Sequence, residues 1–328
     1  MIFKSTKSQV QRVDVCFAYA PGKIILAGEH AVVYGYPALA LTLDKGIRIA
    51  VSKHEDGLSC GPVLRAVGLG FTGEVKPDPE GLGPQVLRLA LKYLIYLYGR
   101  RVKRLMFTVD SNIPGGYGLG SSAALSVALI RAVHIFFGKK LTQNKTLSLA
   151  MKLESIFHGN PSGIDHTVIS TGGLIKFSKN NNHCTFKKIN SKLSLKLAIG
   201  VSGPHVGTSK AVMVLREKMK YHEKAYENIF SGIGQVVNEM SYCITEGKLA
   251  AAGELMDLNQ GYLNALGVST PKLEKMCTIA RERGALGAKL TGAGFGGAVI
   301  ALCDDPIAIV RAFEEAGYLS FATEYKTN

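Results

Sequence analysis

The sequence predicts an α+β fold that is divided into two domains. A chain of 328 residues is long enough for two domains, because single domains usually hold roughly 100–200 residues. Strand-like and helix-like segments alternate irregularly in both halves, without the sustained βαβ repetition of a doubly wound sheet. The run Asn180-Asn181-Asn182 is the most linker-like stretch, so we place the boundary near residue 190 and expect domains at 1–190 and 191–328.

In the first half, runs of β-branched and apolar residues predict strands, and leucines and tyrosines at helical spacing predict helices. The expected strands are 13–20, 39–51 and 105–109, with a turn at Pro21-Gly22-Lys23 between the first two. The expected helices are 84–98, 121–137 and a third from the N-cap Thr142 to about residue 157. The helix 121–137 is apolar nearly all round, so we expect it to be buried.

The second half begins with an expected strand and continues into a long helical region. Its expected elements are a strand at 195–202, a helical stretch at 208–266, a helix opened by Thr270-Pro271, a strand at 298–303, a helix from Asp305 and a strand at 319–325. No internal repeat relates the two halves.

The composition of the chain limits the kinds of partner and site that it can have. The formal net charge is +14, which suits a polyanionic substrate or a plain solvated surface. The densest basic runs, at 100–104 and 187–188, are short and lack interleaved aromatic residues, which disfavours nucleic acid as a partner. The six cysteines are scattered without a C-x-x-C pair, so we expect buried, reduced thiols. No apolar run approaches the ~20 residues that a transmembrane helix needs.

The first chemical motif is the glycine-rich segment from Gly118 to Ala124, between an expected strand and a buried helix. Glycines let the backbone approach a ligand closely, and the start of a helix offers unpaired N–H groups and partial positive charge to an anion. The lysine of a Walker A loop is missing, and Ala123 stands where a G-x-G-x-x-G motif has its third glycine. Either a phosphate site or a tight turn with serine caps fits this segment.

Three further segments carry polar residues in unusual settings. The stretch 20–35 places Lys23, Glu29 and His30 among glycines and apolar residues, which fits either a functional polar cluster or a solvated loop. The loop 289–297 has four glycines in six positions before a strand, suited to close approach to a ligand or to the first loop. Glu154 and Asp165 flank a Gly/Pro break that could fold both carboxylates toward one point, as phosphoryl transfer requires.

Together these segments resemble the GHMP kinases, which phosphorylate galactose, homoserine, mevalonate or phosphomevalonate. They occur in that family's order and span residues 20–297. The stretches 21–35, 158–165 and 259–269 are most similar to the branch that acts on mevalonate. Tyr117 is a departure, because the family usually has a small residue just before Gly-Leu-Gly.

The resemblance implies a fold of two domains with the active site in the cleft between them. The N-terminal domain would resemble a domain of a small-subunit ribosomal protein, and the C-terminal domain would be ferredoxin-like. It further implies ATP-dependent phosphorylation of the primary hydroxyl of mevalonate, giving 5-phosphomevalonate and ADP in isoprenoid and sterol biosynthesis.

The resemblance also implies a role for each matching residue. Asp165 would act on the substrate hydroxyl with Lys23 beside it, and Ser122 and Glu154 would hold Mg²⁺. Glu29, His30 and Thr208 would line the acceptor pocket together with Lys23 and Asp165. The ATP phosphates would be cradled by Gly118, Leu119, Gly120, Ser121, Ser122 and Ala123, with Thr291, Gly292, Ala293 and Gly294 supporting them.

The expected partners are therefore ATP and mevalonate, with a homodimer left open and neither nucleic acid nor a membrane expected. We expect a cytoplasmic enzyme, with organelle import left open. Two alternatives remain: another small-alcohol kinase of the family, and a non-catalytic metabolite sensor with the same fold. The intact set of Lys23, Ser122, Glu154 and Asp165 argues against the sensor.

Overall fold

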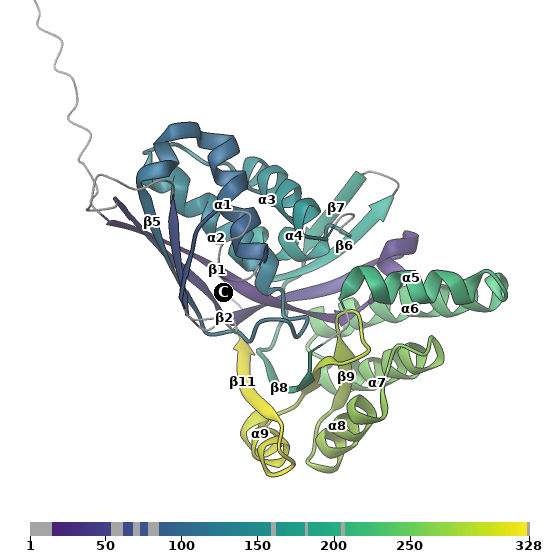
Figure 1. The fold of residues 1–328 in the computed structure, drawn as a ribbon. Coiled ribbons are helices and arrows are strands. Elements are labelled where there is room, and N and C mark those ends of the chain that lie inside the picture. Colours follow the sequence, from purple (N-terminus) through teal and green to yellow (C-terminus); the bar gives the residue numbers. More distant parts are fainter. Residues whose placement is uncertain are drawn as a thin grey trace, which may run out of the picture.

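The structure is a computed structural model that describes residues 15–53, 62–67, 73–77, 85–158, 162–180, 183–204 and 207–326. Within these residues it contains two β-sheets with helices packed on them (Figure 1). No described helix combines the length and the apolar character that crossing a bilayer requires.

The first sheet is formed by the N-terminal half of the chain. Its described strands are β1 (Val15–Ala27), β2 (Ala38–Lys53), β3 (Val63–Val67), β4 (Gly73–Val75), β5 (Leu105–Ser111), β6 (Leu174–Asn180) and β7 (His183–Lys188). The strand order is β4-β3-β5-β2-β6-β7, and β1 pairs with β2. Every pairing is antiparallel except that of β3 with β5.

Four helices lie together over this sheet in Figure 1: α1 (Gln85–Tyr98), α2 (Ser121–Phe136), α3 (Gln143–His158) and α4 (Ile164–Thr171). Helix α2 packs directly on β1 and β2, with α3 and α4 against it. Its residues are buried on nearly all sides, which confirms the expectation drawn from its apolar sequence. Short 3₁₀ helices occupy Ala31–Tyr34 and Gly99–Arg104.

The second sheet is formed by the C-terminal half. Its strands are β8 (Leu195–Gly203), β9 (Gly287–Thr291), β10 (Gly297–Leu302) and β11 (Leu319–Tyr325), in the order β11-β8-β10-β9 and all antiparallel. This is the ferredoxin-like order that was expected. The helices of this half are α5 (Thr208–Met219), α6 (Glu223–Thr245), α7 (Leu249–Ala265), α8 (Pro271–Glu282) and α9 (Pro306–Glu315).

The hydrophobic core is continuous between the halves. Leu195, Leu197 and Ile199 of β8 belong to the same buried cluster as the first sheet and α2. A second cluster lies on the other side of the C-terminal sheet, where Ala198 of β8 packs with residues of α8 and α9. Burying apolar surface on both faces of the second sheet fixes it against the first.

Several details differ from the sequence-based expectations. The expected turn at Pro21–Lys23 is wrong, because β1 continues through it with a shift of register between these two residues. The helical stretch 208–266 is divided into α5, α6 and α7. Helix α4 and strands β3, β4, β6 and β7 were not anticipated, since they are short or flanked by polar residues. Residues 289–291, expected as part of the loop 289–297, instead belong to strand β9.

The proposed division of the chain near residue 190 stays a prediction. Residues 181–182 lie outside the described part, and β6 and β7 on either side of them pair as a hairpin of the first sheet. The change from the first sheet to the second occurs between β7 and β8.

The thiols follow the expectation with one exception. The described cysteines are all free, and Cys16, Cys243, Cys277 and Cys303 are buried. Cys184 is exposed because it lies on β7, whose residues all face solvent.

Candidate active site

The glycine-rich loop at 118–120 leads directly into α2. Gly118 and Gly120 both adopt positive φ (79°), and Gly120 caps the helix without any side-chain hydrogen bond. Gly120 therefore contributes no side-chain cap to the N–H groups that begin α2. Uncapped N–H groups at the start of a long helix, with the positive end of the helix dipole, form a site suited to a phosphate.

Lys23 lies beside this loop on β1. Its backbone N–H donates to the carbonyl of Leu119 (2.9 Å), and its Nζ forms an ion pair with Asp165 (3.0 Å). The Lys23 side chain is buried (3% exposed), whereas the Asp165 side chain is 38% exposed. The aspartate is therefore the member of the pair that solvent can reach. A β-carbon at Gly120 would lie 2.7 Å from Cγ of Lys23, which explains why this position needs glycine.

Glu154 faces the same place from α3. Its carboxylate accepts hydrogen bonds from the hydroxyls of Ser122 (3.3 Å) and Ser126 (3.2 Å) on α2. Burial, followed by the negative charge of Asp165, raises the pKa of Glu154 from 4.5 to about 7. The fold thus brings together the two carboxylates that the Gly/Pro break separates in sequence.

These groups fit Mg²⁺ as a bound ion. A hard cation prefers oxygen ligands, and a bound cation would favour the ionised form of Glu154, whose pKa is raised by burial and by the charge of Asp165. Among the described residues, no three His, Cys, Asp or Glu side chains cluster in a way that could hold a metal. Mg²⁺ is commonly held by one or two carboxylates together with water and phosphate oxygens.

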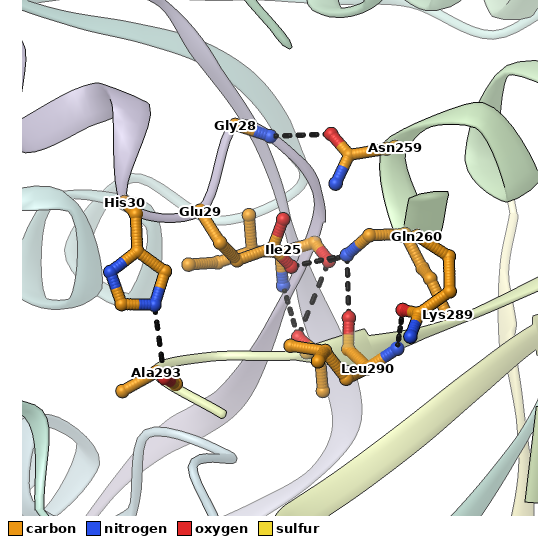
Figure 2. Close-up of polar contacts among 10 residues, drawn as sticks. Ile25, Gly28, Glu29, His30, Asn259, Gln260, Lys289, Leu290 and Ala293 are labelled. Carbon is orange, nitrogen blue, oxygen red and sulfur yellow. Dashed lines mark hydrogen bonds and ion pairs between the residues drawn. The ribbon is translucent and has the colours of Figure 1, made fainter. Parts of the chain in front are cut away.

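The segment Gly28–His30 is attached to the C-terminal half by three contacts, shown in Figure 2. The N–H of Gly28 donates to Oδ1 of Asn259 on α7 (3.3 Å), and Glu29 forms an ion pair with Lys289 of β9. Nε2 of His30 lies 2.9 Å from the carbonyl oxygen of Ala293. Glu29 and His30 are both buried, so the stretch 20–35 is not a solvated loop.

The His30 ring has a defined protonation state. Burial lowers its pKa to about 4, so the ring is neutral near pH 7. Because the partner of Nε2 is a carbonyl, Nε2 carries the ring proton and donates it. Nδ1 is therefore a hydrogen-bond acceptor.

The second glycine loop, at 291–297, touches both the first loop and β1. The hydroxyl of Thr291 accepts from the N–H of Ile25 (2.8 Å). A β-carbon at Gly292 would lie 3.5 Å from the carbonyl oxygen of Gly118, so the two loops pass close to each other. The loop 291–294 therefore lies beside the loop 118–120, and its role in supporting that loop stays a prediction.

Thr208 is the predicted site residue about which least can be said. Its backbone begins α5, but its side chain lies outside the described part of the structure. Four polar residues of the site were given no role from sequence, namely Ser126, Asn259, Gln260 and Lys289. A lysine directly before Leu-Thr in an apolar strand, and an Asn-Gln pair on a mostly apolar helix, are the signals that could have singled out three of them.

Comparisons with known proteins agree with this architecture. The family profile described as "GHMP kinases N terminal domain" matches residues 85–173, and "GHMP kinases C terminal" matches residues 240–319. The chain is 34% identical over 322 residues to the mevalonate kinase of Thermococcus sibiricus, covering 94% of this chain and 95% of that protein. It is 33% identical over 286 residues to the mevalonate kinase of Methanothermobacter thermautotrophicus, covering 87% and 89%.

Solved structures give the same result. The crystal structure of L. major mevalonate kinase in complex with R-mevalonate has a TM-score of 0.81 at 25% identity, covering 100% of this chain and 99% of that chain. The Methanococcus jannaschii mevalonate kinase has a TM-score of 0.78 at 26% identity, covering 98% and 100%. The chain belongs to the GHMP kinase family, in the branch of that family formed by the mevalonate kinases.

Proposed function

We propose that this chain transfers the γ-phosphate of ATP to the primary hydroxyl of mevalonate, giving 5-phosphomevalonate and ADP. The observation that carries the proposal is the meeting of three features within one site. These are the uncapped N-terminus of α2, the ion pair between Lys23 and Asp165, and the buried carboxylate of Glu154. Relatives named mevalonate kinase, similar over nearly the whole chain, support mevalonate as the acceptor.

The triphosphate would lie on the first glycine loop. Glycines 118 and 120 let the backbone approach the phosphates, and the N–H groups that begin α2 donate to phosphate oxygens. Thr291 to Gly294 would hold this loop in place from the C-terminal half. These groups are positioned before the reaction, so they stabilise developing negative charge without reorganising.

We assign Ser122 and Glu154 as the residues that hold Mg²⁺. Held there, Mg²⁺ would supply positive charge that offsets the negative charge of the phosphoryl group during transfer. The contribution of the chain is a carboxylate kept in place by two serine hydroxyls and buried away from competing water.

Asp165 and Lys23 would act on the acceptor. The hydroxyl oxygen of mevalonate attacks the γ-phosphorus, the bond to the β,γ-bridging oxygen breaks, and the hydroxyl proton passes to the Asp165 carboxylate. The Lys23 ammonium, 3.0 Å from that carboxylate, keeps it oriented and stabilises negative charge on the attacking oxygen. A positioned general base of this kind contributes about 10²–10⁴ in rate.

The acceptor pocket would be completed by Glu29, His30 and Thr208, with Ala31 and Val32 as an apolar wall for the methyl group. Both wall residues are buried beside His30. A site built around polar substrate groups discriminates strongly, because the wrong ligand leaves its buried polar atoms unpaired.

The test is a coupled ADP-release assay with mevalonate, phosphomevalonate, galactose and homoserine. We expect kcat/KM for mevalonate to exceed every other value by ~10³ or more. Equal turnover of galactose or homoserine contradicts the assignment to mevalonate, and no ADP release with any acceptor contradicts the kinase activity itself.

A further inference from the structure

Lys289 is a fully buried lysine to which the mechanism above gives no task. It lies on β9 and is 0% exposed, and its ion-pair partner Glu29 is 1% exposed. A buried pair of this kind is seldom kept for stability, because removing two charges from water costs about as much as their attraction returns. Its presence therefore calls for another explanation.

The contacts of Lys289 show what it holds together (Figure 2). Its Nζ donates to Glu29, to the carbonyl of Leu290 (2.6 Å) and to the carbonyl of Ile25 (3.4 Å). Three acceptors match the three hydrogens of an ammonium group. The lysine thus joins β9 to β1 and to the segment that begins the acceptor pocket.

Residue 30, next to Glu29, has a strained backbone. His30 has φ 62° and ψ −50°, a conformation that residues other than glycine rarely adopt. Such a conformation persists only where the surroundings determine it fully. Here contacts fix Gly28 through Asn259, Glu29 through Lys289 and His30 through Ala293, so each of three successive residues is held from the C-terminal half.

The second carboxylate oxygen of Glu29 supplies an independent observation. Oε2 is buried and has no hydrogen-bond partner within the described structure, whereas Oε1 is paired with Lys289. Buried polar atoms are nearly always satisfied by protein, water or ligand. A carboxylate oxygen only accepts hydrogen bonds, so it suits a hydroxyl group and disfavours the carboxylate of a hydroxy acid.

We propose that Lys289 is a positioning residue for the acceptor: it fixes Glu29 so that Oε2 accepts a hydrogen bond from the tertiary hydroxyl of mevalonate, and so that His30 keeps its strained conformation. The primary hydroxyl is then left to Asp165. This inference rests on the proposed function. It adds Lys289 to the residues that determine acceptor binding, although Lys289 itself would contact neither mevalonate nor ATP. Burial raises the pKa of Glu29 and the charge of Lys289 opposes that shift, in keeping with an ammonium that sustains a buried carboxylate.

A double-mutant cycle tests the proposal with Lys289→Met, Glu29→Gln and the two combined. Lys192→Met is the matched control. Lys192 forms an ion pair with Glu246 (2.7 Å) that is exposed to solvent, and neither residue belongs to the proposed site. The measurements are KM for mevalonate, KM for ATP, kcat, calorimetric binding of mevalonate alone, and the midpoint of urea unfolding.

We expect Lys289→Met to raise KM and Kd for mevalonate by ~10-fold or more while KM for ATP stays within a few-fold. The combined variant should regain stability relative to Lys289→Met, because no unpaired buried charge remains. Its affinity for mevalonate should equal that of Glu29→Gln, since Lys289 acts only through Glu29. Lys192→Met should match the wild type in every measurement.

Two results overturn the proposal. The first is a folded Lys289→Met variant whose affinity for mevalonate is within three-fold of wild type. The second is additive losses of affinity in the combined variant, which would mean that Lys289 does not act through Glu29. If Lys289→Met fails to fold, the proposal is tested with the combined variant alone. Its affinity for mevalonate must then equal that of Glu29→Gln. Wild-type turnover of mevalonate is measured first, so failure of the proposed function is seen separately; the cycle then uses whichever acceptor the wild type phosphorylates.

Discussion

Glu154 offers a sharp test of the site because its environment couples protonation to stability. The side chain is 4% exposed, and burial with the neighbouring charge of Asp165 raises its pKa from 4.5 to about 7. A carboxyl whose pKa is higher in the folded than in the unfolded chain binds more protons when folded. Its favourable contribution is therefore present at low pH and is lost as pH rises through the folded pKa.

These two pKa values give a magnitude. Between pH 5.5 and 8.5 the linkage relation makes the ionisation of Glu154 lower the free energy of unfolding by about 2 kcal/mol. Glu154→Gln keeps the shape of the side chain but cannot ionise, so this loss should vanish. We therefore expect the free energy of unfolding of Glu154→Gln, relative to that of the wild type, to increase by about 2 kcal/mol from pH 5.5 to pH 8.5.

The assay is urea unfolding with a chelator and without nucleotide, at pH 5.5, 7.0 and 8.5. Glu217→Gln is the control, because it makes the same substitution at an exposed carboxylate, which is paired with Lys220. A difference between Glu154→Gln and wild type that is constant across pH would refute the buried, charge-repelled environment assigned to Glu154. Added Mg²⁺ and ADP should stabilise the wild type more than Glu154→Gln, because an amide is a poorer ligand for a hard cation.

The remaining predictions concern catalysis and the two loops. Asp165→Asn should lower kcat by ~10²–10⁴ with KM for ATP within a few-fold, and retention of more than about a tenth of kcat would remove Asp165 from its role as base. His30→Ala should lower kcat/KM for mevalonate in steady-state assays without unfolding the protein, since it removes the contact with Ala293; unchanged kcat/KM would mean that the ring is only structural. Gly120→Ala should destabilise the protein by roughly 1–3 kcal/mol in urea titrations, because its φ of 79° and the Lys23 side chain at 2.7 Å leave no room for a methyl group. A fully stable, active Gly120→Ala variant would contradict the tight packing of this loop.

Local sequence patterns predicted a large part of the architecture. The apolar stretch 121–137 became the buried helix α2, and Thr270-Pro271 became the cap and first turn of α8, with the Thr270 side chain accepting from the N–H of Leu273. These signals depend on residues close together in the chain, so they can be read before the fold is known. The continuation of β1 through Pro21 was missed, because the register shift that accommodates it depends on pairing with β2.

For the candidate site, too, some features follow from local sequence and others depend on the tertiary structure. The sequence by itself determined which segments are candidates for the chemistry: the glycine loops, the stretch around Lys23 and Glu29, and the two carboxylates on either side of a break. Only the tertiary structure decided which groups meet. It set Lys23 against Asp165, Glu154 against two serines, and Glu29 against Lys289, 260 residues further along the chain. Such contacts, and the pKa shifts that follow from burial, arise when distant segments pack together and exclude water, which no local pattern of residues specifies.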